Sequence, residues 1–83
     1  NIVIMSMGFV LIKAAPKHER HVYIKLLQLP EITELHPLFG EYDLLAIIKA
    51  ENFEKLGDII TNKIRTAEGV IDTKTLTGTQ SLK

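Results

Sequence analysis

The sequence predicts a small α+β domain in which two helices cover one face of a four-stranded antiparallel sheet. The first observation is the length, because 83 residues suffice for one domain and predict a single one over residues 1–83. The second is the composition, which at 46% hydrophobic and 24% charged residues is typical of a globular chain. The third is the apolar pattern, which alternates between extended and helical spacing in the order strand, helix, strand, strand, helix, strand.

The first strand and the first helix are predicted from the segment that ends at Pro30. Residues 2–13 are dense in Val, Ile, Met, Phe and Leu on both sides of an extended chain, which indicates a buried central strand. Pro16 suits the first turn of the following helix, and Pro30 ends it. The apolar stripe of this helix consists of Val22, Tyr23, Leu26, Leu27 and Leu29.

A hairpin is predicted in the middle of the chain. Residues 32–39 contain Pro37, which cannot donate a ladder hydrogen bond, so this strand should lie at an edge of the sheet. Gly40-Glu41 forms the turn. The strand at residues 42–49 contains a continuous apolar run and is therefore predicted to be central.

The second helix and the last strand complete the pattern. Asn52 can cap the helix, and Gly69 is expected at its C-terminal cap. Gly57 lies inside this helix, where we expect it to let the helix approach the sheet closely. Residues 70–79 form a polar, β-branched strand, which predicts the other edge. The apolar stripe of the helix consists of Phe53, Leu56, Ile60 and Ile64.

This order is the ferredoxin-like βαββαβ plan, in which right-handed crossovers place the first and third strands at the centre. Two helices cover only one face of such a sheet, yet both sides of the two central strands are apolar. An uncovered apolar sheet face marks an interface, so we expect it to pack against a second copy or a partner. One side comprises Val3, Met5, Met7, Phe9 and Leu11 in the first strand, and Leu45 and Ile47 alternate with Leu44, Ala46 and Ile48 in the third.

Charge and cysteine usage exclude several functions. Ten Lys and Arg residues balance ten Asp and Glu residues, so the chain lacks the positive field that attracts nucleic acid or anionic membranes. We therefore expect no direct nucleic-acid partner and no membrane partner, and the apolar segment at residues 2–12 is too short to span a bilayer. The absence of cysteine excludes disulfides, a thiolate nucleophile and sulfur-ligated zinc, and favours a cytoplasmic location.

The most specific segment is Phe39-Gly40-Glu41-Tyr42-Asp43, at the hairpin between an edge strand and a central strand. With this motif the chain resembles the effector-binding RAM domain of the Lrp/AsnC transcription regulators. The resemblance covers residues 8–79. It includes Lys17-His18-Glu19-Arg20 before the first helix, and Lys63-Ile64-Arg65 followed by Gly69-Val70 at the end of the second.

The resemblance implies a homodimer that assembles further, into an octamer or a similar ring, with a free amino acid bound between dimers. It implies ligand-binding roles for Gly40, Tyr42 and Asp43 in the turn and for Thr73 and Thr75 in the last strand. The chemistry fits, because backbone N–H groups can bind a carboxylate and a side-chain carboxylate can bind an ammonium. In the simpler alternative, Gly40 only makes the turn, Tyr42 packs at an interface and Asp43 bonds a nearby backbone amide.

Family members also carry an N-terminal helix-turn-helix, for which this chain offers no third helix. Two explanations stay open: a stand-alone RAM protein, or a regulator from which the DNA-binding half has been removed, as the start at Asn1 would allow. In the first case the partners include full-length Lrp/AsnC regulators, whose activity the domain would modulate.

Metal binding and catalysis have weaker signals. His18 and His21 are three residues apart, but the neighbouring Lys17, Arg20 and Lys25 make that helix face cationic, so no metal is predicted. No catalytic residue and no cofactor are predicted either, because Ser6 and Ser81 lack a plausible His and Asp arrangement. The alternative is a dimeric α+β barrel enzyme, of the small oxygenase or decarboxylase type, with His36 or His21 inside a closed polar cavity.

Overall fold

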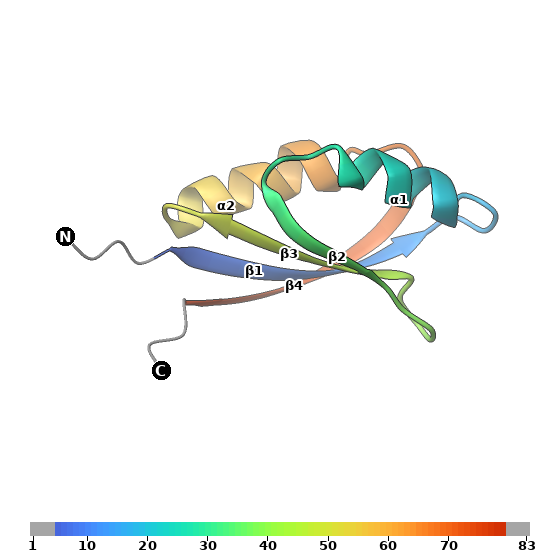
Figure 1. Ribbon diagram of the computed structural model, residues 1–83, viewed down its shortest axis with the longest axis horizontal. Coiled ribbons are helices and arrows are strands. Elements are labelled where there is room, and N and C mark those ends of the chain that lie inside the picture. The colour runs from blue at the N-terminus through green and yellow to red at the C-terminus, as the bar shows by residue number, and fades with distance from the viewer. Residues whose placement is uncertain (1–4, 80–83) are drawn as a thin grey trace.

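The computed structural model describes residues 5–79 and has the predicted ferredoxin-like architecture (Figure 1). The strands form one antiparallel sheet in the order β2-β3-β1-β4, so the first and third strands are central, as predicted. Residues 2–4 of the predicted first strand lie outside the described residues. The elements are β1 (Ser6–Ala14), α1 (Glu19–Leu27), β2 (Ile32–Pro37), β3 (Leu44–Ala50), α2 (Phe53–Ile59), the π-helical turn η1 (Ile60–Ile64) and β4 (Val70–Thr79).

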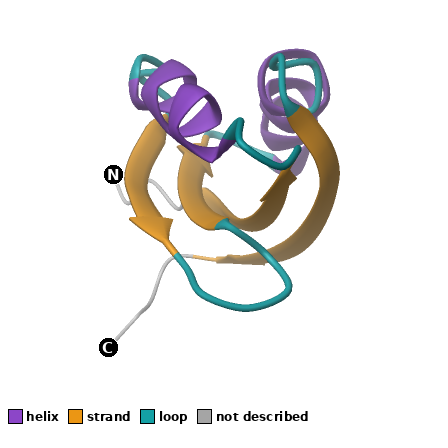
Figure 2. Cartoon of the chain, turned by 90° about the vertical axis from the view of Figure 1, so that its right-hand side faces the viewer, coloured by secondary structure: helices purple, strands orange, loops and turns teal. Residues whose placement is uncertain are grey.

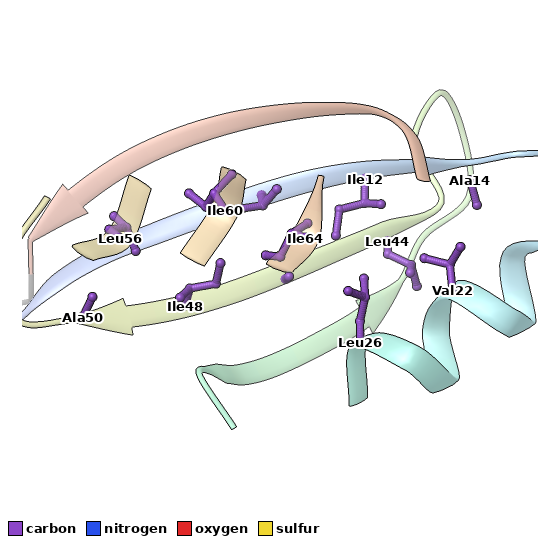
Figure 3. Packing of buried hydrophobic residues seen from close by; sticks show 12 residues of the cluster. Ile12, Ala14, Val22, Leu26, Leu44, Ile48, Ala50, Leu56, Ile60 and Ile64 are labelled. Carbon is purple, nitrogen blue, oxygen red and sulfur yellow. The ribbon is translucent and has the colours of Figure 1, made fainter. Parts of the chain in front are cut away.

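Both helices lie side by side on one face of the curved sheet (Figure 2). The core between the layers is made by alternate residues of the central strands, such as Val10 and Ile12, and by the inner faces of the helices. Leu56, Ile60 and Ile64 follow one another along the second helix above the sheet, as the helical spacing predicts (Figure 3). Helical and strand periodicities therefore identify most of the core, but Leu27, predicted in the apolar stripe of the first helix, is 54% exposed.

The helix boundaries differ from the prediction in two places. The first helix begins at Glu19 rather than at Pro16, because Pro16 and Lys17 form a turn in which Lys17 has a φ of 71°. The second helical segment ends at Ile64, so Gly69 is not its C-terminal cap but part of the turn that leads into β4. The Asn52 cap is confirmed, since its side-chain oxygen accepts a hydrogen bond of 2.8 Å from the Lys55 N–H.

The expected role of Gly57 is wrong. A Cβ placed there would meet nothing within 4 Å, so this glycine does not bring the helix closer to the sheet. Close packing occurs instead at Gly8, which lies under Leu56, and at Gly69, where an added Cβ would lie 2.8 Å from Val22 Cγ2. Phe53, predicted in the buried stripe, is the first residue of α2 and is 55% exposed.

The helix-free face of the sheet is apolar, as the alternation predicts. Its central part is formed by half-buried side chains of β1 and β3, with Leu76 of β4 exposed beside them. The apolar residues of this face are Met7, Phe9, Leu11, Leu45, Ile47 and Leu76. Among the helices described, none is long and apolar enough to cross a bilayer.

Candidate functional site

The turn between β2 and β3 is held rigidly against β1. Leu38 N–H donates to the Asp43 carbonyl at 2.8 Å and closes the turn, while Asp43 N–H donates to the Ile12 carbonyl at 2.9 Å. The Asp43 side chain adds a third bond, because its Oδ2 accepts from Ala14 N–H at 2.8 Å. The backbone-amide bond of the simpler alternative is therefore present, and it leaves Oδ1 available on the same carboxylate.

The tip of this turn projects from the end of the molecule (Figure 1). Gly40 has a φ of 128°, a left-handed conformation that favours glycine, and an added Cβ would meet nothing within 4 Å. Phe39 beside it is fully exposed. Gly40 thus shapes the tip and leaves open space where a side chain would begin.

Tyr42 lies close enough to Asp72, near the start of β4, to be affected by its charge. Burial of the phenol raises the pKa of Tyr42 above its usual range, and the carboxylates of Glu41 and Asp72 add to the rise. Thr73 of β4 pairs with Ile12 of β1. On the opposite side of β1, the Ile12 carbonyl accepts the hydrogen bond from Asp43 N–H. Asp43 and Thr73 therefore flank the same point of the central strand.

Thr75 lies apart from the turn. It pairs with Val10 and lines a groove of about 340 Å³ between β4 and α2, together with Phe53, Leu56, Gly57, Ile60, Thr61 and Thr77. Thr73 lines a smaller hollow of about 150 Å³ beside Arg65 and Asp72. The five predicted residues are thus divided: Asp43 lines a third groove described below, Thr73 and Thr75 line two different hollows, and Gly40 and Tyr42 line none of the three.

A further groove, of about 430 Å³, lies between α1 and the turn and includes Asp43. Its walls carry charges of both signs, from Arg20 and from Glu19 and Asp43, above apolar side chains such as Tyr23 and Leu44. Within residues 5–79, the Arg20 side chain makes no hydrogen bond or ion pair, so its guanidinium can donate hydrogen bonds to a carboxylate ligand. Sequence reasoning did not assign Arg20 to the site, although the Lys17-His18-Glu19-Arg20 segment carried the signal.

The histidines lie outside all three hollows. His36 Nε2 lies 3.0 Å from Glu34 Oε1 on the exposed edge strand, and His21 Nε2 lies 3.9 Å from Glu68 Oε2 with its side chain 43% exposed. His18 Nδ1 lies 3.1 Å from the Pro16 carbonyl. In the part of the chain that the structure describes, no three His, Cys, Asp or Glu residues are grouped as metal ligands would be.

Comparison with known proteins identifies the family. Residues 7–83 match the Lrp/AsnC ligand binding domain. An uncharacterised HTH-type transcriptional regulator of Pyrococcus abyssi is 33% identical over 81 residues, which cover 94% of this chain and 54% of that protein. The HTH-type transcriptional regulator FL11 of Pyrococcus furiosus is 33% identical over 70 residues, or 84% of this chain and 46% of FL11. The chain thus spans about half the length of these curated relatives.

Solved structures of similar proteins have the same fold. The crystal structure of FFRP-DM1 is 34% identical with a TM-score of 0.84, covering 88% of this chain and 97% of that one. AsnC of E. coli is 25% identical with a TM-score of 0.85, covering 94% of this chain and 53% of that one. A regulator of Neisseria meningitidis solved as an L-Met complex shares the fold, at 18% identity and a TM-score of 0.81. With its fold, its turn motif and this match over nearly its whole length, the chain belongs to the Lrp/AsnC family, in which it corresponds to the ligand-binding domain.

Proposed function

We propose that the chain is a single effector-binding and assembly domain that binds a free amino acid beside the β2–β3 turn. The observation that carries this proposal is the α1–turn groove of about 430 Å³, where Arg20 faces the same space as Glu19 and Asp43. A zwitterion needs a cationic partner for its carboxylate and an anionic one for its ammonium, and this groove provides both. Its apolar walls provide a place for the ligand side chain.

The family match and the L-Met complex of the Neisseria relative support an amino acid as the class of ligand. Gly40 and Tyr42 would shape the entrance at the turn, and Thr73 and Thr75 would supply hydroxyls from β4. Because Thr75 lies away from the turn within one chain, its participation needs a neighbouring subunit.

Assembly is the second part of the proposed function. The apolar helix-free face is suited to a homodimer, and further association would give an octamer or a similar ring. Full-length Lrp/AsnC regulators are proposed as partners, in the cytoplasm, because the curated relatives are named transcriptional regulators.

A regulatory rather than an enzymatic role is proposed from the same features. The barrel-enzyme alternative needs His21 or His36 in a closed cavity, but both side chains are exposed and neither lines any of the three hollows described above. The matches to named regulators favour effector binding.

Thermal unfolding in the presence of each standard amino acid tests the proposal. A ligand at one hundred times its Kd stabilises the folded state by about 2.7 kcal/mol, which is readily visible in a domain of this size. We expect one or a few amino acids to raise Tm, and Arg20→Gln or Asp43→Asn to abolish the rise. Lys25→Gln is the control, because Lys25 is a cation on the same helix outside the groove.

Two results would contradict this proposal: no amino acid shifts Tm, or the shift persists unchanged in both groove variants. Asp43→Asn keeps an oxygen that can accept from Ala14 N–H, so a lost response in that variant reports the charge rather than the fold.

A further inference from the structure

The apolar part of the α1–turn groove contains two aromatic rings that come from different elements. Tyr23 belongs to α1 and Phe39 to the turn, and both line the groove of about 430 Å³ together with Pro37, Leu38 and Leu44. Tyr23 is half-buried and packs against the core, whereas Phe39 is fully exposed at the rim. In a single chain the ring of Phe39 is therefore uncovered beside an apolar hollow.

The charged residues of this groove are Glu19, Arg20 and Asp43. In the proposed function, Arg20 binds the carboxylate of a free amino acid and Asp43 binds its ammonium group. Glu19 lies in the first turn of α1, where the positive end of the helix dipole offsets its negative charge. The other walls are apolar side chains, which disfavour a charged or strongly polar side chain on the ligand.

The charged and aromatic parts of the groove are separated along α1. Tyr23 follows Glu19 by four residues and Arg20 by three, so it lies on the same face of the helix, about one turn further along. One turn advances roughly 5 Å along the axis. An amino acid whose polar groups lie at Arg20 therefore extends its side chain towards the ring of Tyr23.

Ring–ring contacts favour an aromatic ligand over an aliphatic one. Both kinds of side chain can be buried against Leu38 and against Leu44, which is itself buried and forms the floor. Only an aromatic ring also gains stacked or edge-to-face contacts with Tyr23 and Phe39. This gain corresponds to a Kd about two to ten times lower.

We propose that the effector is an aromatic amino acid, whose ring contacts Tyr23 and is covered by Phe39. The aromatic preference rests on the proposed function, since it concerns the ligand of the same groove. Phe39 then determines specificity: its exposed ring is not packed within the chain, and it becomes covered when the ligand binds. Its replacement should therefore change ligand preference while leaving the fold intact.

Titration calorimetry with each standard amino acid tests this preference. We expect phenylalanine, tyrosine or tryptophan to bind more tightly than leucine, alanine, aspartate or lysine. Phe39→Leu keeps an apolar side chain but removes the ring, so it should raise the Kd of the aromatic ligand about two- to tenfold and leave that of leucine nearly unchanged. Phe53→Leu is the matched control, because Phe53 is an exposed aromatic residue outside this groove.

Three results would overturn the aromatic preference. In the first, an aliphatic or charged amino acid binds as tightly as the aromatic ones. In the second, Phe39→Leu keeps the aromatic preference of the wild type. In either case, binding that is lost in Arg20→Gln would still support the proposed function. In the third, no amino acid binds, which would reject the proposed function and the aromatic preference together.

Discussion

The Asp43 carboxylate fastens the turn to β1, and we propose that it also contacts the effector. Oδ2 bonds Ala14 N–H and fastens the turn to β1, while the residue also lines the groove opposite Arg20. A carboxylate can accept more than one hydrogen bond, so the structural bond does not exclude ligand binding. The two tasks respond differently to substitution and can be separated.

We predict that Asp43→Ala lowers the free energy of unfolding by about 1–3 kcal/mol, because it leaves Ala14 N–H without its acceptor. Asp43→Asn should lose much less, since its side-chain oxygen can replace Oδ2. Urea denaturation of both variants measures the difference. Equal losses in the two variants would show that the charge, rather than the hydrogen bond, stabilises the turn.

At the scale of elements, Gly57 and Gly69 should respond in opposite directions to substitution by alanine. Gly57 lies in α2 with space around it, so Gly57→Ala should stabilise the fold by about 0.5–1 kcal/mol through helix propensity. Gly69 has a φ of 94° and lies against Val22, so Gly69→Ala should destabilise it by more than about 1 kcal/mol. Thermal unfolding measures both. A stabilising Gly69→Ala would contradict the close packing of the β4 turn against α1.

The ion pair between Glu31 and Lys63 joins the segment after α1 to η1. The hydrogen bond from Lys63 is the main cause that holds the pKa of Glu31 below its ordinary value of 4.5. A carboxyl whose pKa is lower in the folded state stabilises that state above its unfolded pKa, and this contribution is lost as pH falls through the folded pKa.

We therefore predict that Glu31→Gln is less stable than wild type at neutral pH, and that the difference shrinks as the pH falls below about 4.5. Urea denaturation across that range measures it, with Glu54→Gln on the exposed start of α2 as the control. A difference independent of pH would mean that Glu31 acts through packing rather than through its charge.

At the scale of the whole molecule, the apolar helix-free face should control dimerisation. Phe9 and Leu45 lie at its centre, on the two inner strands, and are only half-buried in one chain. Phe9→Lys or Leu45→Lys should therefore prevent the proposed homodimer from forming while leaving the helix-side core intact, because a lysine can remain solvated only on an uncovered face.

Light scattering of these variants, with circular dichroism to verify folding, measures this prediction. Leu27→Lys is the control, since Leu27 is an exposed apolar residue on the opposite layer. A folded Leu45→Lys variant that stays dimeric would show that another surface joins the two copies.

The element order, the sheet topology and most of the core could be predicted from sequence because they follow from local periodicity. Val10, Ile12, Leu56 and Ile64 are buried as their spacing predicts. Asn52 caps its helix as predicted, since capping depends on neighbouring residues. The turn motif at residues 39–43 similarly indicated the family, which the family match confirms, whereas its role in the candidate site stays a prediction.

Only the tertiary structure decided which residues far apart in sequence meet. The bond from Ala14 to Asp43, the inclusion of Arg20 in a groove with Asp43, and the separation of Thr75 from the turn depend on strand register and on helix placement. The prediction for Gly57 is wrong for the same reason, because the position of a glycine in the sequence does not show whether its backbone lies close to another element. Local pattern determined the elements and their order, whereas the site depends on contacts across the sheet that no local pattern encodes.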